Sequence, residues 1–399
     1  MRLPGRIRDH MTVANGGGNS LGGVGDMRNG ALRVVAAIAV AAATTAAAST
    51  ADGSGPHREP GSLLVDETFT GASADSRFIG YGSACLTGAP RGAAPAESTN
   101  HPLGGCRRDP AGPVPPGGVA MHGFLQLTDA HVEETGAALF DSPIPAGEGL
   151  EVTFEQWQYG NTTPAPADGI SFFLTDGAAR LTTPGAFGGS LGYAQKLPDG
   201  STDGRFVPGV SGGYLGIGLD VLGDYFGDGE RRGNGCERGS PAGRVFGPPA
   251  PGPNIVSARG PGNGNDGYCL LAATTGNATT KGPWPSTLPG RLHGDLKKMP
   301  SDATPERAEQ LLEPMKRTVR LMVTPPPEPM ATVDIDFQDG RGFRQVLRFP
   351  APEPVPDTVK LGFAASTGTL TDVQLVRHLT VRAGRSFPPG SGRLRPRTN

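Results

Sequence analysis

The sequence of 399 residues lacks an excess of charge of either sign, with 36 lysines and arginines against 38 aspartates and glutamates. Residues 1–50 hold five of the arginines and two of the aspartates, so the rest of the chain has 31 basic and 36 acidic residues. A protein that binds nucleic acid needs a basic surface for the phosphates, and this composition argues against one. The arginines of segment 384–399 stand among Pro, Gly and Ser, which predicts a basic disordered tail.

Common catalytic motifs are also missing. The sequence has no H-E-x-x-H and no Cys–His arrangement that would indicate a known hydrolase chemistry. Its histidines are scattered, and we expect each of the following to be structural or solvent-facing: His122, His131, His293 and His378.

Cysteine is scarce, and no C-x-x-C pair exists that would indicate a thiolate zinc site. The four cysteines are Cys85, Cys106, Cys236 and Cys269, and they allow three disulfide pairings. Proximity in sequence favours Cys85–Cys106 and Cys236–Cys269, each of which would close a Gly/Pro-rich loop. Disulfides also indicate an exported protein.

An apolar stretch rich in Ala and Val occupies residues 31–48, with arginines on its N-terminal side and an A-x-A pattern at its end. This predicts a secretory signal and upstream extension over residues 1–50, with Met27 as an alternative start, followed by a linker over 51–62. A transmembrane anchor is the alternative, but the stretch is weakly hydrophobic and no basic stop follows. We expect a secreted protein without stable membrane insertion after cleavage.

Glycine and proline are abundant, with 63 Gly and 40 Pro spread between apolar runs, which indicates frequent turns. ATVDIDF is the clearest strand, because Val333, Ile335 and Phe337 alternate with aspartates. ISFFL and YLGIGLDVL are apolar throughout, as expected for strands buried on both faces. The other strand-like segments are GFLQLTD, LEVTFEQW, VRLMV, VLRF, VKLGFAAS and LVRHLTV.

One stretch has helical spacing: TPERAEQLLEPMKR, capped by Thr304 and ended or kinked by Pro314. Residues 229–268 and 281–300 are predicted to be Gly/Pro-rich loops. No repeat of about 20–50 residues is visible, which disfavours a propeller or solenoid. Many strands with almost no helix predict an all-β sandwich with long loops, over residues 63–383.

Four segments resemble, in order, parts of the L-type (legume) lectin domain. ADGISFFL at 167–174 is similar to that family's A-D-G strand, and GGSLGY at 188–193 to its Gly-Gly loop. LGIGLDVLGDYFGD at 215–228 is similar to its metal-binding strand and loop, and LGFAASTG at 361–368 to its late core strand and turn. The resemblance spans about residues 63–383 and implies a concanavalin A-like β-sandwich (jelly roll), in a secreted bacterial member of the family.

The resemblance implies a carbohydrate site made of Asp168, Gly188, Gly189 and Asp224. Sugar hydroxyls donate and accept hydrogen bonds, which suits a fixed carboxylate beside exposed backbone N–H groups. In the family the bond before the aspartate is cis, so Ala167–Asp168 is a candidate cis peptide. The alternative is a plain Asp-Gly turn before a buried strand.

An acidic loop over residues 220–230 follows the apolar strand, with Asp220, Asp224, Asp228 and Glu230 within eleven positions. Calcium takes about six to eight oxygen ligands, including carboxylates and backbone carbonyls. The calcium ligands that the resemblance implies are Asp220, the carbonyl of Leu222, Asp224 and Asp228. The alternative is a solvated acidic turn that Arg231 and Arg232 partly neutralise.

Two departures from the family bear on this site. Gly218 stands where the family's metal strand has Glu, and no histidine follows until His293, so we expect no transition metal. Asp224 stands where the family has Asn, and a carboxylate cannot donate a hydrogen bond to a sugar oxygen. Tyr225 or Phe226 is a candidate platform for a sugar ring, with core packing as the alternative.

The expected function is a secreted carbohydrate-binding protein, whose partner is a carbohydrate or glycoconjugate, and not an enzyme. The first alternative is a glycoside hydrolase of the concanavalin A-like superfamily, which needs two carboxylates about 5–10 Å apart. Glu151 and Glu155 lie on one strand face with about 13 Å between their backbones, which is too far. The second alternative is an adhesion module that has lost sugar binding, which Gly218 and Asp224 favour.

Overall fold

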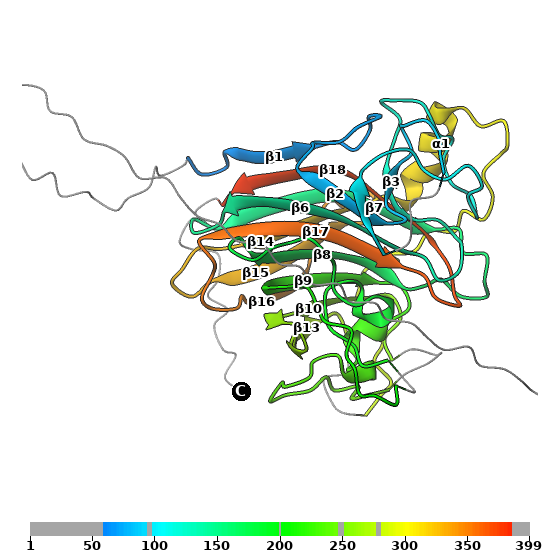
Figure 1. Cartoon of the computed structure of the whole chain (residues 1–399). Helices are drawn as coiled ribbons and strands as arrows, with labels where there is room; N and C mark the ends of the chain where they lie inside the picture. Colours follow the sequence, from blue (N-terminus) through cyan, green and yellow to red (C-terminus); the bar gives the residue numbers. More distant parts are fainter. Residues whose placement is uncertain (1–58, 94–97, 199–200, 246–250, 277–280, 385–399) are drawn as a thin grey trace, which may run out of the picture. The chain divides into compact units, whose positions relative to one another are not determined.

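The structure, a computed structural model, describes residues 59–93, 98–198, 201–245, 251–276 and 281–384 (Figure 1). The expected signal segment lies outside these residues, as do most of the expected linker and tail. The described strands begin at Leu63 and end at Ala383. They form two antiparallel sheets, so the predicted all-β sandwich is confirmed. None of the described helices has the length and apolar character needed to cross a membrane.

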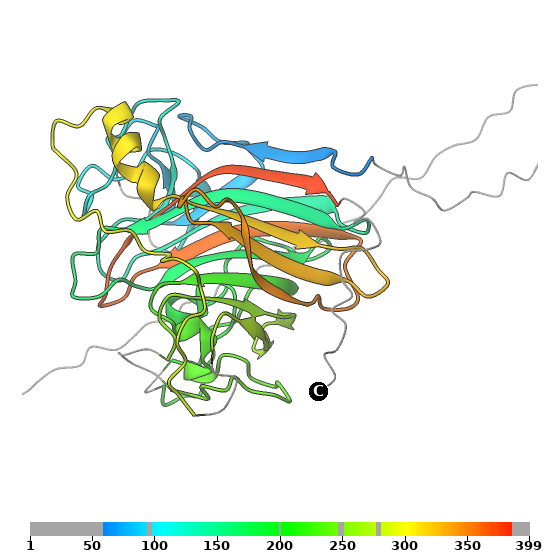
Figure 2. The same ribbon diagram turned by 180° about the vertical axis from the view of Figure 1, so that it is seen from behind.

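The first sheet has β7 and β18 at its centre. In spatial order it contains β16 (Arg344–Pro350), β15 (Met330–Asp336), β14 (Arg317–Val323), β7 (Leu150–Tyr159), β18 (Val373–Ala383), β5 (Leu125–Thr128) and β3 (Cys85–Leu86), with β1 (Leu63–Glu67) also paired to β18. Figure 2, the view from behind, brings its yellow and orange strands to the front. The predicted alternation in β15 is confirmed, since Val333 and Ile335 are buried in the core.

The second sheet carries the segments that resemble the lectin motifs. In spatial order it contains β12 (Asp266–Gly267), β11 (Gly262–Asn263), β9 (Gly213–Asp220), β8 (Gly169–Asp176), β17 (Thr358–Ser366), β6 (Thr135–Pro145), β2 (Phe78–Gly82) and β4 (Asn100–Pro102). β10 (Ile255–Arg259) also pairs with β9, and β13 (Leu270–Ala273) pairs with β10. β8 lies between β9 and β17, so the A-D-G segment enters the middle of this sheet.

The main core lies between the two sheets. Phe154 of β7 packs against Phe363 of β17 and Phe172 of β8, with ring centroids 5.0 and 5.5 Å apart. Such contacts between large rings bury much apolar surface and fix how the sheets pack. The core therefore holds β8 and β17 firmly at the ends from which the candidate site is built.

A second core covers the outer face of the second sheet. It contains Phe173, Tyr193, Tyr225 and Tyr268, and all four are buried. β8 and β9 are therefore buried on both faces, as their continuous apolar runs predicted. The cover comes from the loops that follow β8 and β9, which contain η1 (Gly188–Ser190), η2 (Asp224–Phe226) and η3 (Gly229–Arg231).

The prediction that residues 229–268 form only loops is wrong. The segment contains β10, which pairs with β9 in register from Ile255–Asp220 to Arg259–Gly216, and the short strands β11 and β12. A run of five residues between Asn254 and Gly260 is too short for its periodicity to be recognised in sequence. The described part of 281–300 contains no helix or strand, as predicted.

The predicted helix is present as α1 (Pro305–Leu312). Thr304 caps it by accepting a hydrogen bond from the Arg307 backbone N–H at 3.3 Å, and the 3₁₀ turn η4 (Glu313–Met315) follows at Pro314. The indole N–H of Trp157 donates to the carbonyl of Leu312 at 3.0 Å. This contact attaches the helix to the outer face of the first sheet, away from the second sheet.

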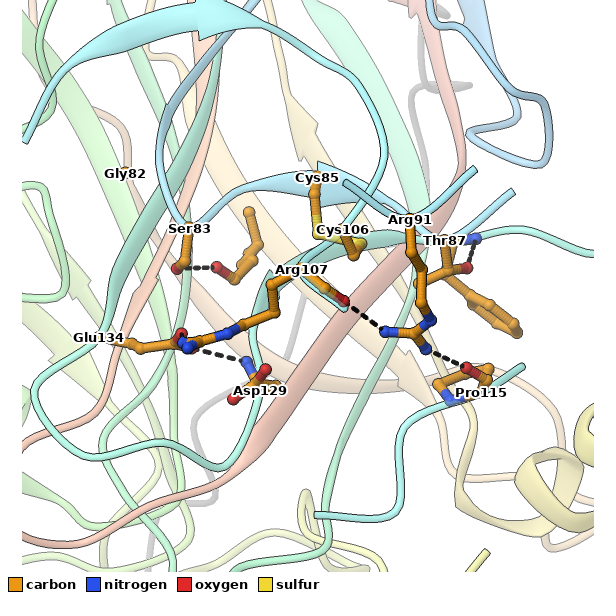
Figure 3. Close-up of a disulfide and its surroundings, with 12 residues drawn as sticks. Gly82, Ser83, Cys85, Thr87, Arg91, Cys106, Arg107, Pro115, Asp129 and Glu134 are labelled. Atoms are coloured by element: carbon orange, nitrogen blue, oxygen red, sulfur yellow. Dashed lines mark hydrogen bonds and ion pairs between the residues drawn. A yellow bond between two sulfur atoms is a disulfide. The ribbon is translucent and has the colours of Figure 1, made fainter. Parts of the chain in front are cut away.

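Both favoured disulfides are present, Cys85–Cys106 and Cys236–Cys269. Figure 3 shows the first of them beside Arg91, whose guanidinium donates to the carbonyls of Arg107 and Pro115. The second ties the loop that follows η3 to the start of β13. The two disulfides therefore fasten Gly-rich segments that have few apolar side chains of their own.

Candidate functional site

Asp168 directly precedes β8, and its bond to Ala167 is cis, as the resemblance implied. Ser366, the last residue of β17, donates its hydroxyl to Oδ2 of Asp168 at 2.7 Å. The Asp168 backbone N–H donates to the carbonyl of Ser366 at 2.9 Å. The residue is 6% exposed. Burial raises the pKa of Asp168 to about 7, and the Ser366 hydroxyl opposes that shift.

The Gly-Gly loop forms η1 beside this carboxylate. The Gly188 backbone N–H donates to the hydroxyl of Ser366 at 3.0 Å, so Ser366 links the loop to Asp168. Gly189 has no room for a side chain, since a Cβ there would lie 2.5 Å from Nη2 of Arg232 and 2.6 Å from Cβ of Asp224. The loop is therefore pressed against both the aspartate strand and the acidic loop.

Asp224 is the first residue of η2 and is 8% exposed. Its Oδ1 atom is buried and has no hydrogen-bond partner. Burial raises the pKa of Asp224, while the charge of Arg232 lowers it. The four residues expected to contact sugar thus lie together at one end of the second sheet, although they come from three segments.

Three groups at the edge of this site were not found by sequence reasoning. The rings of Phe187 and Tyr81 stack with centroids 6.1 Å apart and planes at 25°, and both are partly exposed. The amine of Lys196 lies 3.4 Å from the position that a Cβ on Gly188 would take. Phe187 directly precedes the Gly-Gly pair, and this position in the sequence could have indicated its place at the site. Nothing in the sequence connects Tyr81 or Lys196 to the site.

Tyr225 and Phe226 do not form a platform for a sugar ring. Both are buried, and Tyr225 packs in the second core. A Cβ on Gly218 would lie 2.3 Å from the Tyr225 ring, so this ring fills the space beside Gly218. The alternative of core packing is therefore correct, and Phe187 is a partly exposed ring at the site.

Asp220 holds the acidic loop from within. Its Oδ1 accepts the Gly223 N–H at 2.6 Å and its Oδ2 accepts the Tyr225 N–H at 2.7 Å. The side chain is fully buried, and burial raises the pKa of Asp220 to about 8. Both carboxylate oxygens are thus already occupied by the backbone that follows.

Asp228 is directed to other partners. Its Oδ1 accepts from Nη2 of Arg259 at 3.0 Å, and its Oδ2 accepts the Ser240 N–H at 2.5 Å. Arg259, at the end of β10, is 0% exposed. The remaining contacts of its guanidinium are with the carbonyls of Tyr225 at 2.9 Å, Tyr268 at 2.8 Å and Gly227 at 2.6 Å.

Arg232 is the second buried cation of this loop, at 1% exposed. Its Nη1 donates to the carbonyl of Asp224 and to that of Gly227, the latter at 3.1 Å, and its Nε donates to the hydroxyl of Ser190 at 3.2 Å. Arg231 is exposed. The loop is therefore not the solvated turn of the alternative interpretation, since its neutralising arginine lies inside the protein.

The implied calcium ligands do not assemble into a metal site. Asp220 is used by backbone amides and Asp228 by Arg259. Guanidinium groups take the carbonyls of Asp224, Tyr225 and Gly227, whereas the recorded bond of Leu222 is from its N–H to the Asp168 carbonyl. Within the described residues, three potential ligands come within 4.8 Å of one another at Asp129, His131 and Glu134, which belong to a different loop. The residues present do not fit a calcium ion braced by the acidic loop.

The cluster of Asp129, His131 and Glu134 has a cation of its own. Arg107 donates to Glu134 at 3.2 Å, as Figure 3 shows. Oδ1 of Asp129 lies 2.5 Å from Nδ1 of His131. This arrangement has the features of a structural ion-pair network.

Glu155, one of the two carboxylates weighed for a glycoside hydrolase, is also held by neighbouring side chains. It contacts His378 at 2.8 Å and Lys316 at 3.4 Å. Together these groups hold the pKa of Glu155 below its ordinary value despite burial. The other two histidines of the expected structural set behave in the same way: His122 contacts Glu309 at 3.1 Å and His293 contacts Asp372 at 3.2 Å.

A cavity of about 280 Å³ lies next to the acidic loop. Its lining residues include Asp228, Arg231, Arg232, Asn234 and Arg244. Asp168 and the Gly-Gly pair are not among them. The cavity therefore lies beyond Arg232 and separate from the site of the carboxylate and the Gly-Gly loop.

No family model matches this chain, and a search of curated proteins also finds no match. Among solved structures it is similar to the calcium- and mannose-bound exoplasmic/lumenal domain of VIP36, at 13% identity and a TM-score of 0.41, over 79% of this chain and 86% of that one. It is similar to peanut lectin at 14% identity and a TM-score of 0.42, over 80% and 97%. It is similar to lectin II from Ulex europaeus at 12% identity and a TM-score of 0.40, over 81% of this chain and 100% of that one.

Two of these three solved structures are named as lectins. With TM-scores below 0.5, the similarities carry no argument about function, which must be made from this chain's own residues.

Proposed function

We propose that this protein binds carbohydrate, without cleaving it, at the site formed by Asp168, Gly188, Gly189 and Asp224. The observation that carries the proposal is the meeting of three distant segments at the Ser366 hydroxyl and Gly189. Such a meeting places a fixed carboxylate beside a glycine-rich turn, a combination suited to a ligand with many hydroxyl groups.

Each group has a distinct part in the proposed site. Because Ser366 already donates to Oδ2 of Asp168, we assign Oδ1 to the sugar hydroxyl. The half-exposed ring of Phe187, stacked on Tyr81, would receive the apolar face of the sugar ring. Lys196 would supply the donor that Asp224 cannot, since a carboxylate only accepts.

Secretion is part of the same proposal. The two disulfides support this, because disulfides form and persist mainly in oxidising compartments, and a protein that meets extracellular glycans has to be exported. The signal over residues 1–50 remains a prediction from sequence.

The test is a glycan array with the full chain and with two variants. Asp168→Asn should abolish binding to every glycan that the unaltered chain retains, because an amide nitrogen replaces one acceptor oxygen. The control is Asp176→Asn at the other end of β8, where the exposed carboxylate caps the Ala178 N–H and binding should persist. If the folded chain binds no glycan, the adhesion module is the remaining interpretation. Release of reducing sugar from a polysaccharide panel would favour the glycoside hydrolase.

A further inference from the structure

Two buried arginines, Arg232 just after the acidic loop and Arg259 at the end of β10, donate to this loop where a metal-dependent loop would need a cation. We infer that Arg232 and Arg259 together brace this loop in place of calcium, so that the loop and the site beside it form without metal. The part of this inference that concerns sugar rests on the proposed function. The part that concerns the loop does not.

The oxygen atoms of the loop are of the kind that a hard cation binds, namely backbone carbonyls and carboxylates. In this protein the carbonyls of Asp224, Tyr225 and Gly227 and one carboxylate oxygen of Asp228 accept hydrogen bonds from guanidinium groups. The carbonyl of Gly227 accepts from both arginines, from Arg232 at 3.1 Å and from Arg259 at 2.6 Å. Two fixed positive charges therefore converge on the same turn.

Arg232 connects the loop to the candidate sugar site. It lies against Gly189 on one side and donates to the carbonyls of Asp224 and Gly227 on the other. Its Nε also reaches Ser190 at 3.2 Å, so one side chain holds η1 and η2 together. A residue in this position sets the distance between the Gly-Gly amides and Asp224.

Arg259 connects the loop to the sheet. It comes from β10 and joins the carbonyls of Tyr225 and Gly227, the carboxylate of Asp228 and the carbonyl of Tyr268. Tyr268 directly precedes Cys269, whose disulfide to Cys236 fastens the far end of the same loop. The loop is therefore attached at both ends by bonds that need no ion.

The planar guanidinium is essential to this arrangement. Its five N–H donors point in fixed directions, and Arg259 uses three of its nitrogens on four acceptors. A lysine ammonium has one nitrogen and cannot reach oxygens on opposite sides of the loop. Arg→Lys at either position should therefore behave as a loss and not as a conservative change.

The experiment measures thermal unfolding of the full chain in EDTA and in millimolar calcium chloride, together with isothermal calorimetry of calcium alone. The expected result is the same midpoint in both buffers and no heat of calcium binding. A rise of several degrees in calcium, or saturable calcium binding that Asp220→Asn abolishes, would overturn the inference. These measurements decide the matter even if the arginine variants fail to fold.

Variants then separate bracing from general stability. Arg232→Lys and Arg259→Lys should lower the midpoint, and Arg232→Lys should also weaken any glycan bound by the unaltered chain at least tenfold, in EDTA and calcium alike. The matched control is Arg317→Lys on β14 of the first sheet. Arg317 is also buried and donates to backbone carbonyls, including that of Arg291 at 2.6 Å, but it lies outside the acidic loop. It should lower the midpoint and leave glycan binding intact.

The outcomes also separate this inference from the proposed function. If no glycan binds, the proposed function fails while the calcium measurements still test the arginines. If glycans bind in calcium and are lost in EDTA, the proposed function stands and the arginine inference is wrong.

Discussion

The hydroxyl of Ser366 donates to Oδ2 of Asp168 at 2.7 Å, across 198 positions of the chain. The same hydroxyl accepts the Gly188 N–H at 3.0 Å. One small side chain at the end of β17 thereby fixes both the carboxylate and the turn of the candidate site. The geometry of this site is consequently set by the sheet and not by the loops alone.

Ser366→Ala removes both of these hydrogen bonds. Leaving the part-buried Gly188 N–H and a buried oxygen of Asp168 without this partner should lower the free energy of unfolding by about 1–3 kcal/mol. Glycan affinity should fall about tenfold, which corresponds to roughly 1.4 kcal/mol. Denaturant unfolding and glycan titration measure the two effects. Ser83→Ala, which removes a hydroxyl donor to the Leu127 carbonyl, is the control and should spare glycan affinity.

Gly189→Ala places a methyl group where Arg232 and Asp224 already lie, at 2.5 and 2.6 Å. The loop has to move away from Asp224, so glycan binding should be lost while the sandwich stays folded. Gly147→Ala is the control, because nothing lies within 4 Å of a Cβ there and no loss is expected. Unchanged glycan binding in the Gly189 variant would show that the Gly-Gly loop does not contact the ligand.

Phe187→Ala removes the half-exposed ring beside the Gly-Gly loop. Loss of ring stacking should weaken glycan binding about tenfold, since an aromatic contact contributes on the order of 1 kcal/mol beyond its buried area. Phe343→Ala, which removes an exposed ring packed under Arg320, should have no such effect. Equal glycan affinities of the Phe187→Ala and Phe343→Ala variants would show that Phe187 is not the platform for the sugar ring.

Replacing Cys236 and Cys269 by serine opens a loop of 33 residues. The chain-entropy model gives a loss of about 3–4 kcal/mol in unfolding free energy. Amide hydrogen exchange should also accelerate over residues 224–236, because this disulfide anchors that segment. Replacing Cys85 and Cys106 should lower the unfolding free energy to a similar degree while amide exchange in 224–236 stays slow. Fast exchange in 224–236 in this variant would contradict the role of the Cys236–Cys269 disulfide as the anchor of that segment.

The raised pKa of Asp372 predicts the direction in which the free energy of unfolding changes with pH. Burial raises its pKa to about 6 from 3.8, and the hydrogen bond from His293 opposes the shift. The folded state therefore holds the proton more tightly, and stability falls as pH rises from about 4 to about 6. Relative to Asp372→Asn, the unaltered chain should lose up to about 3 kcal/mol of unfolding free energy across that window, at about 1.4 kcal/mol per pKa unit. Denaturant unfolding at pH 4, 5, 6 and 7 measures it, and parallel curves for the two proteins would contradict it.

Much of the fold could be predicted from the sequence because its signals are local. The alternation in ATVDIDF and the continuous apolar runs of β8 and β9 depend only on neighbouring residues. Proximity was enough to pair the cysteines correctly. The cis bond at Asp168 followed from the family resemblance, and no periodicity would have indicated it.

The interior of the candidate site could not be predicted in the same way. Arginine is rarely buried, so the sequence suggests a place for Arg232 only in the alternative of a solvated turn, and no local pattern marks Arg259 as buried. Whether an arginine faces water or a set of carbonyls depends on contacts between segments such as β10 and η2, which no local pattern records. Phe187 was missed for a similar reason, since its partner Tyr81 lies more than a hundred positions away.

The Tyr225 ring that fills the space beside Gly218 has one more consequence. Placing a glutamate at position 218 requires that the ring leave first, and removing the ring alone opens a hole in the second core. Neither change is tolerable without the other. A single substitution therefore cannot give this strand the family's metal-ligand glutamate, and only a paired change of Gly218 and Tyr225 keeps the second core filled.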